Sequence, residues 1–201
     1  MRVLVACEES QRVCMAFRAK GHIAFSCDLK DCSGGFPQYH IKGDCRLVIE
    51  SHSWDLLIAH PPCTYFSRVN FLNYYRNGVF NEQRFEKALE SAKFFNYLLN
   101  CGIPRICVEN PVPMSLFKDV LPPYDEKIQP YEFNEPYSKA TCLWLCNLPL
   151  LIPTCHVLDH TPYVLLNGNL MDGRFDIAKQ SEYRSKTFYG IAKAMAEQWD
   201  F

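Results

Sequence analysis

The chain of 201 residues lacks several features that would place it in particular protein classes. No window approaches about 18 uninterrupted apolar residues, so no membrane span is expected. The opening segment MRVLVACEES turns acidic after six residues, which argues against a secretion signal. Net charge is -1, so a protein that coats nucleic acid through overall positive charge is excluded. We expect a globular protein of the cytoplasm, without membrane association.

The sequence also lacks any CxxC pair, although it has 11 cysteines. In a reducing compartment such thiols are mostly small buried hydrophobic groups. The nearest approach to a metal-binding pattern is Cys142, Cys146, Cys155 and His156, but the spacing lacks two paired knuckles, and the LWL between the first two is typical of a strand. We therefore predict no metal site.

Short apolar runs alternate with helical patterns along most of the chain. RVLVA, HIAFSCDL, WDLLIAH and RICVEN are expected strands. A first helix is expected after Ser10 as its N-cap, with Gly21 ending it. A second is expected over 85–100, where one face carries Phe85, Leu89, Ala92, Phe95 and Leu99. A last helix is expected in SKTFYGIAKAMAEQWDF, where one side carries Ile191, Ala194, Met195 and Gln198. This order predicts an α/β fold with a Rossmann-like, doubly wound, mostly parallel sheet in one domain, 1–201.

Prolines concentrate at about 111–165. Such a segment cannot hold long helices, because proline breaks the helical hydrogen-bond ladder. We expect irregular structure there around one or two edge strands, notably ATCLWLC.

Polar and reactive residues follow the predicted strands. In a parallel sheet the carboxyl ends of the strands meet at one edge, where ligands bind. The residues at that edge are Cys7, Glu8, Glu9, Ser10, Asp28, Asp44, Pro61, Pro62, Cys63, Glu109 and Asn110. Several of these residues also have a purely structural alternative. Glu8 and Glu9 would stabilise a helix N-terminus, Asp28 would form a turn, and Asp44 would cap a helix. Cys63 would be an inert thiol, and Glu109 would lie in a turn before proline.

The motifs together resemble a known family. A Pro-Cys followed by Ser67, then Glu109-Asn110 at a later strand end, resembles the C5-cytosine DNA methyltransferases. More closely, VLVACEES, SCDL, HPPCTYFS, VENP, KATCLWL and GIAKAMAEQW resemble the small phage and prophage DNA-cytosine-methylase-like proteins, over residues 3–199. The resemblance implies a class I methyltransferase-like fold.

The resemblance also implies a reaction. Cys63 would add to C6 of cytosine, Glu109 with a raised pKa would protonate or hydrogen-bond N3, and Asn110 would hold the Pro62-Cys63 loop. The methyl donor would be S-adenosylmethionine, and a base in duplex DNA would first be flipped out.

The same resemblance assigns a cofactor site. Asp28 would bind the ribose hydroxyls and Asp44 would lie near the adenine amino group. The loop from Cys7 through Glu8 and Glu9 to Ser10 would pass the methionine moiety, and Pro61 and Gly190 would lie beside the cofactor.

Four departures from the family pattern stand out. The loop ACEESQRV has no glycine, the paired arginines are replaced by Lys139 and Thr141, and Gly190 is followed by Ile191 where the family has asparagine. About 40 residues separate KATCLWL from RSKTFYG, too few for a target-recognition domain.

A segment rich in aromatic and basic residues directly follows Cys63. Thr64 to Phe85 mixes tyrosine and phenylalanine with arginine, a composition that stacks bases and neutralises phosphates. Ser67, Arg68 and Arg76 are the candidate contacts there, together with Lys139 and Thr141. The alternative is a solvated loop with a few core aromatics.

The sequence thus predicts a DNA (cytosine-5-)-methyltransferase-like enzyme. Two other functions stay open. One is C5 alkylation of a free pyrimidine nucleotide, or of a modified pyrimidine, by a modified cofactor. The other is a non-catalytic phage accessory protein that binds the cofactor or DNA.

Overall fold

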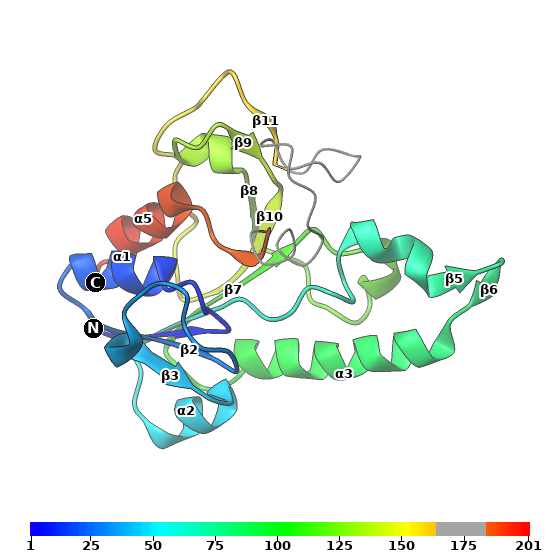
Figure 1. The fold of residues 1–201 in the computed structure, drawn as a ribbon, viewed down its shortest axis with the longest axis horizontal. Coiled ribbons are helices and arrows are strands. Elements are labelled where there is room, and N and C mark those ends of the chain that lie inside the picture. Colours follow the sequence, from blue (N-terminus) through cyan, green and yellow to red (C-terminus); the bar gives the residue numbers. More distant parts are fainter. Residues whose placement is uncertain (164–183) are drawn as a thin grey trace.

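The protein is built on a seven-stranded sheet (Figure 1). The computed structural model describes residues 1–163 and 184–201, apart from the side chains of Val69 and Arg76. The strand order is β3-β2-β1-β4-β7-β10-β8. The bounds are β1 (Arg2–Ala6), β2 (Ile23–Asp28), β3 (His40–Lys42), β4 (Leu56–Ala59), β7 (Arg105–Pro111), β8 (Glu126–Ile128) and β10 (Thr141–Cys146). The first five strands of this order run parallel, and β10 is antiparallel to both of its neighbours.

Helices cover both faces of the sheet. Helices α1 (Arg12–Ala19) and α5 (Tyr189–Gln198) pack together on one face, and α2 (Cys45–Ser51) and α3 (Glu82–Leu99) lie on the other. Alternate strand residues enter the two cores: Val3 and Val5 pack on the α1–α5 side, whereas Leu4 and Ala6 pack on the α2–α3 side. A strand buried on both faces has no polar position, which is why β1 is apolar from Val3 to Ala6, the four residues that are buried.

The predicted doubly wound, mostly parallel sheet and its four apolar strands are confirmed. The placement of ATCLWLC at the sheet edge was wrong, because β8 pairs with β10 and lies outside it. Strand β7 was expected to end with Glu109 and Asn110. It continues to Pro111, because β10 supplies hydrogen-bonding partners beyond the end of β4.

Short elements fill the connections. The 3-10 turns are η1 (Pro37–Tyr39), η2 (Arg68–Tyr74), η3 (Ser115–Phe117) and η4 (Pro130–Phe133), and the two-residue strands are β5 (Tyr75–Arg76), β6 (Val79–Phe80), β9 (Tyr137–Ser138) and β11 (Thr161–Pro162). Within 111–163 the structure holds η3, β8, η4, β9, β10 and β11 and no α-helix, as the prolines require.

The helix ends show one wrong prediction. Gln11, not Ser10, is the N-cap of α1. Gln11 has the left-handed backbone conformation, and its side chain forms no capping hydrogen bond to the helix. Gly21, with φ +87°, takes the left-handed conformation expected of a residue that stops a helix. In α3 the fully buried stripe includes the expected Ala92 and Phe95.

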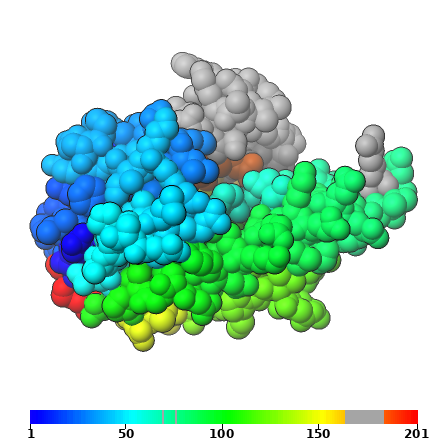
Figure 2. Space-filling model, turned by 90° about the horizontal axis from the view of Figure 1, so that it is seen from below, coloured from blue at the N-terminus to red at the C-terminus, as the bar shows by residue number. Residues whose placement is uncertain are grey.

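Elements η2, β5, β6 and the start of α3 form an arm that projects from the body (Figure 1), and the space-filling view shows it extending beyond the sheet domain (Figure 2). Phe66 and Tyr74 anchor it in the core on the α2–α3 side, while Leu72 and Val79 are exposed. The arm begins with Arg68, a few positions after Cys63.

Gly190 allows α5 to pack against η4. A Cβ at this position would lie 1.7 Å from the carbonyl oxygen of Phe133. The Gly190 N–H also donates to Glu135 Oε1 at 3.0 Å. The observed role of Gly190 is therefore close backbone packing.

We predict that Gly190→Ala destabilises the fold by about 1–3 kcal/mol, because α5 must move away from η4 to admit the methyl group. Urea unfolding measures the loss. Gly43→Ala is the matched control, since a Cβ there meets nothing within 4 Å and its stability should change little. Equal stability of the two variants would contradict the packing role.

Candidate active site

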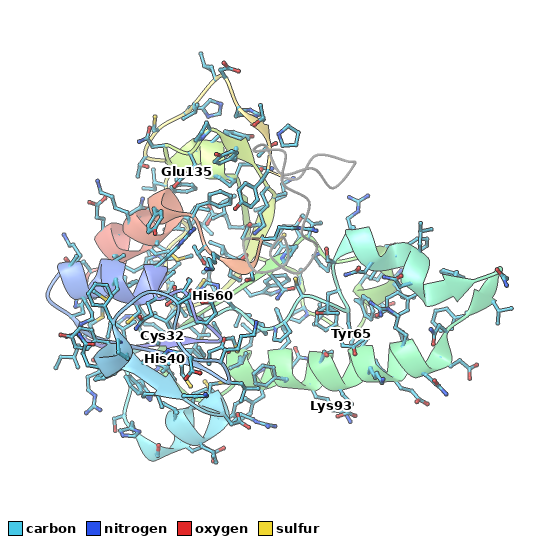
Figure 3. The ribbon with its side chains drawn as sticks, in the orientation of Figure 1. Cys32, His40, His60, Tyr65, Lys93 and Glu135 are labelled. Carbon is cyan, nitrogen blue, oxygen red and sulfur yellow. The ribbon has the colours of Figure 1, made fainter. Side chains whose placement is uncertain are left out.

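Two neighbouring strands bring an acid and a base together at the carboxyl edge of the sheet. The register of β4 and β7 pairs Ala59 with Val108, so the next residues, His60 and Glu109, lie side by side. His60 Nδ1 is 2.9 Å from Glu109 Oε2. Both side chains are largely buried, with exposed fractions of 7% and 15%. His60 lies near the middle of the molecule (Figure 3).

The electrostatics of this pair differ from the sequence-based prediction for Glu109. Burial alone would raise the pKa of Glu109, but the hydrogen bond and charge of His60 outweigh it and lower that pKa. Conversely, burial lowers the pKa of His60 while Glu109 and Glu8 raise it, and the net direction is upward. The expectation of a raised pKa at Glu109 was therefore wrong, because the sequence-based reasoning omitted the partner histidine.

The turn that carries Cys63 is tied to β7. Asn110 is buried, and its Nδ2 donates to the carbonyl oxygen of Pro61 at 2.8 Å. The Cys63 carbonyl oxygen accepts from the N–H groups of Phe66 and Ser67, both at 3.1 Å, which closes the turn. Asn110 thus fixes the loop of Pro61, Pro62 and Cys63 relative to Glu109.

Cys63 is half-buried next to charged groups. Burial raises the pKa of its thiol, and the negative charge of Glu109 adds to that effect. Lys139 acts in the opposite direction and lowers the pKa of Cys63. In the free protein the thiol is consequently protonated at neutral pH.

Lys139 completes the cluster from the segment before β10. Burial lowers the pKa of Lys139, while Glu109 and Cys63 raise it. Its Nζ donates to the carbonyl oxygen of Arg184 at 2.6 Å. Thr141 is buried, and its hydroxyl donates to the Lys139 carbonyl oxygen at 3.3 Å. Lys139 therefore supplies positive charge beside both candidate catalytic residues.

The loop after β1 is shaped by two residues with positive φ, Cys7 at 59° and Gln11 at 60°. Glu8 points inward, where its carboxylate accepts from Val13 N at 2.6 Å and Cys14 N at 3.2 Å. It caps the short helix α1, as the structural alternative held, and this use occupies both oxygens. Ser10 is buried beside it, with its hydroxyl 3.5 Å from Glu8 Oε1.

Gln11 and Glu9 attach the segment after β2 to this loop. The Gln11 amide exchanges two hydrogen bonds with the backbone of Phe36, at 2.9 and 3.0 Å. Glu9 accepts from the Ser33 hydroxyl and pairs with Lys186 Nζ at 3.8 Å. The loop without glycine is thus held in shape by side chains.

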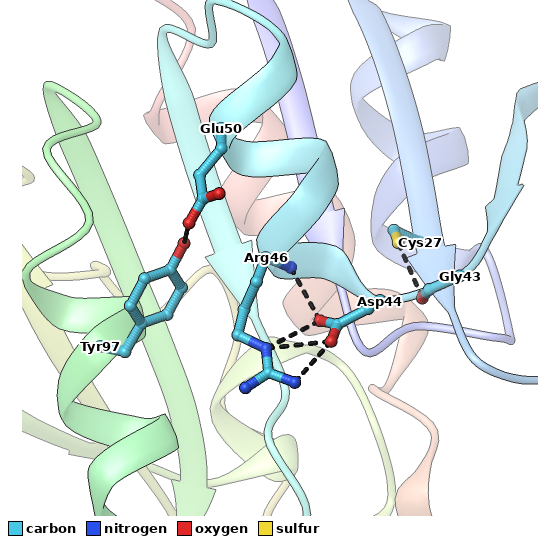
Figure 4. A network of polar contacts seen from close by, with 6 residues as sticks. All are labelled: Cys27, Gly43, Asp44, Arg46, Glu50 and Tyr97. Carbon is cyan, nitrogen blue, oxygen red and sulfur yellow. Dashed lines mark hydrogen bonds and ion pairs between the residues drawn. The ribbon is translucent and has the colours of Figure 1, made fainter.

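The two predicted cofactor aspartates lie at the ends of β2 and β3. Asp28 Oδ1 accepts from Lys30 N at 2.9 Å, the turn contact of the structural alternative. Its Oδ2 has no hydrogen-bond partner among the residues that the structure describes. Asp44 caps α2 through Arg46 N at 3.0 Å and also binds the Arg46 guanidinium, so its carboxylate turns toward Arg46 (Figure 4).

The segment after Cys63 offers fewer free aromatic faces than its composition indicates. Phe66 and Tyr74 are buried, so neither can stack on a base. Arg84 lies 5.1 Å from the ring centres of both Tyr65 and Tyr74 and donates to Thr64. The core-aromatic alternative is correct for Phe66 and Tyr74.

The other candidate contacts of this segment are placed as follows. Ser67 is buried and forms a bridge with Pro113, whereas Arg68 is exposed. The side chain of Arg76 lies outside the described residues. Of Ser67 and Arg68, the two whose side chains are described, Arg68 is the accessible one.

His60 is the functional candidate that sequence reasoning missed. It directly follows β4, so the rule that selected Cys63 and Glu109 also applies to it.

In residues 1–163 and 184–201, no group of three or more histidine, cysteine or acidic side chains is placed to hold a metal ion. Over the same ranges, no helix combines the length and apolar character needed to cross a membrane.

Comparison with known proteins gives structural matches only. No family model and no curated protein matches the chain. A solved E. coli prophage protein, assigned as a DNA modification methyltransferase, matches with TM-score 0.50 and 12% identity over 78% of this chain and 52% of that one. The fold is shared. The S. pombe Dnmt2 methyltransferase matches with TM-score 0.41 and 17% identity, over 75% of this chain and 51% of its own. The chain thus spans about half the length of these two structures, and the first likeness confirms the methyltransferase-like fold.

We predict that Asn110→Ala costs about 1–3 kcal/mol of stability and loosens the Pro-Cys turn, because the buried Pro61 carbonyl loses its donor. Chemical denaturation measures the cost, and the rate of Cys63 alkylation by iodoacetamide measures the loosening. Asn100→Ala removes a comparable amide-to-carbonyl bond, to Asn96, on an exposed residue with negative φ and is the control. An unchanged alkylation rate in Asn110→Ala would contradict the tether.

The His60–Glu109 pair should make stability depend on pH in two directions. The Glu109 contribution is present above its unfolded pKa of 4.5 and is lost as pH falls through the lower folded pKa. The His60 contribution is complete below 6.5 and is lost as pH rises through the higher folded pKa. The destabilisation by Glu109→Gln should therefore be larger at about pH 5.5 than at about pH 8.5. Equal losses would contradict the charged pair.

Proposed function

We propose that the protein is an S-adenosylmethionine-dependent methyltransferase that acts at C5 of a pyrimidine, with cytosine in DNA as the favoured substrate. The observation that carries this proposal is the joint placement of Cys63 and Glu109 at one sheet edge, with Asn110 fixing the Cys63 turn. The shared fold supports it, since ligands of such sheets bind at this edge.

The reaction requires a nucleophile, because C5 of cytosine is too poor in electrons to attack a methyl donor unaided. The Cys63 sulfur adds to C6 and pushes electron density toward N3 and C5. The raised pKa of the Cys63 thiol means that its proton must leave during substrate binding. Lys139 favours that loss, because its positive charge stabilises the thiolate.

Glu109 is placed to act on N3. One carboxylate oxygen binds His60, which leaves the other for the base. Lys139 lowers the pKa of Glu109 as well, so the family's paired arginines have a functional substitute in a single buried lysine. Once C5 has gained the methyl group, loss of the C5 proton and departure of the thiolate restore the aromatic ring.

The residues present fit the methyl donor. Asp28, with one free oxygen at the end of β2, would bind the ribose hydroxyls. Asp44 would reach the adenine amino group at small cost, because its pair with Arg46 is solvent-exposed. Cys7 and Pro61 line the same edge, and bound S-adenosylmethionine supplies an electrophilic methyl group there. The inward turn of Glu8 and the packing of Gly190 against Phe133 leave these two residues with structural roles.

The two candidate substrates, a base in duplex DNA and a free pyrimidine nucleotide, differ in how much of the nucleic acid the protein must contact. A base in duplex DNA must leave the stack to reach a buried cysteine. The arm beside Cys63, with exposed Arg68, is the element placed to contact the nucleic acid. The short segment between β10 and α5 favours, as a second candidate, a free pyrimidine nucleotide, which needs neither sequence recognition nor base flipping.

Methyl transfer from labelled S-adenosylmethionine distinguishes the functions. Label in DNA that disappears with Cys63→Ala supports the main proposal, and label only in cytosine nucleotides supports the second. Cofactor binding without transfer to either substrate indicates the non-catalytic accessory protein. Cys155→Ala is the matched control, because this exposed cysteine lies outside the sheet edge and should leave transfer unchanged.

A further inference from the structure

We propose that His60 is a positioning residue that orients Glu109 and holds the proton that Glu109 delivers to the pyrimidine. The catalytic part rests on the proposed function. The pairing and its charge state are properties of the folded protein and can be tested without substrate.

The geometry of His60 is specific to this task. Its side chain projects from the first position after β4, and the parallel register places Glu109 beside it. The Nδ1–Oε2 distance of 2.9 Å is that of a hydrogen bond. This contact orients the Glu109 carboxyl group in the protein before substrate binds.

The second ring nitrogen argues against a purely structural histidine. His60 Nε2 is buried and has no hydrogen-bond partner among the described residues. Buried polar atoms that serve only the fold are almost always paired. His60 Nε2 therefore stays available for a polar partner that the described residues do not supply.

The charges around His60 favour its protonated form. Glu109 faces it from β7, and Glu8 acts on it from the loop after β1. Lys139, from the segment before β10, is the opposing positive charge. Two carboxylates against one ammonium leave an excess negative charge, which an imidazolium neutralises at a site with little solvent.

The proton balance of the step is as follows. As the Cys63 sulfur bonds to C6, the proton on His60 Nδ1 passes to Glu109 Oε2. The carboxyl group then turns about its Cγ–Cδ bond, so that Oε2–H gives this same proton to N3. His60 is left neutral with hydrogen on Nε2. When the C5 proton leaves to solvent and the C6–S bond breaks, the N3 proton returns through Glu109 to His60.

The first test is an NMR titration of the histidines in the folded protein without substrate. We expect the His60 midpoint to lie above the ordinary histidine value of about 6.5 and to fall in Glu109→Gln. His52, an exposed histidine after α2, is the internal control and should not respond to that substitution. A His60 midpoint below about 6.5 that Glu109→Gln leaves unchanged would overturn the proposal.

The second test compares His60→Gln with wild type, since glutamine keeps an N–H donor but cannot titrate. We expect kcat to fall about 100-fold with little change in KM. The wild-type rate should decline as pH rises through the His60 midpoint, and this decline should be absent in the variant. His52→Gln should keep the wild-type rate and profile, and circular dichroism should show that both variants are folded.

A folded His60→Gln protein with wild-type rate and pH profile would overturn the catalytic role. If the wild-type protein methylates no pyrimidine, the proposed function fails instead, and the NMR titration alone then decides whether His60 holds the proton for Glu109.

Discussion

The site depends on the parallel pairing of β4 with β7. Because side chains alternate along a strand, the register that aligns Ala59 with Val108 places His60 and Glu109 on the same face, toward α1 and α5. It places Asn110 on the opposite face, where it holds Pro61. A slip of one residue would reverse both arrangements at once, so the buried apolar residues that specify the register also specify the chemistry.

A second constraint comes from the loop after β1. The loop contains no glycine, and Cys7 and Gln11 take the positive φ angles that its turn requires. The cost is offset by side-chain contacts, since the Gln11 amide forms two hydrogen bonds with the backbone of Phe36 and Glu8 caps α1. Side-chain hydrogen bonds therefore hold the shape of this loop.

Sequence reasoning was most successful where periodicity and strand ends decide the outcome. The apolar strands, the helix over α3 and the Asp44 cap were all readable, because each depends on neighbouring residues. Side-chain direction was not readable. Whether Glu8 faces the sheet edge or α1 depends on the backbone at Cys7. Cys7 has a positive φ, which the sequence does not indicate because no glycine or asparagine stands there. The internal position of β10 was likewise hidden, since it depends on its long-range pairing with β7 and β8.

The pKa of Glu109 shows the same limit. An isolated buried carboxyl group has a raised pKa, and that is what its motif implied. The direction reverses because His60, 49 positions earlier, meets it across β4 and β7. In the proposed reaction the acid for the pyrimidine is thus shared between two residues, and Cys63 lies beside that pair with Lys139 as the compensating charge.

The proposed reaction requires that Cys63 form a covalent bond to C6 of a pyrimidine. Intact-protein mass spectrometry after incubation with S-adenosylmethionine and DNA containing 5-fluorocytosine detects this bond, because fluorine at C5 blocks the proton loss that would release the enzyme. We expect a stable adduct whose mass is that of protein plus methylated DNA, mapped by proteolysis to Cys63. Protein that methylates ordinary cytosine yet forms no such adduct would contradict it.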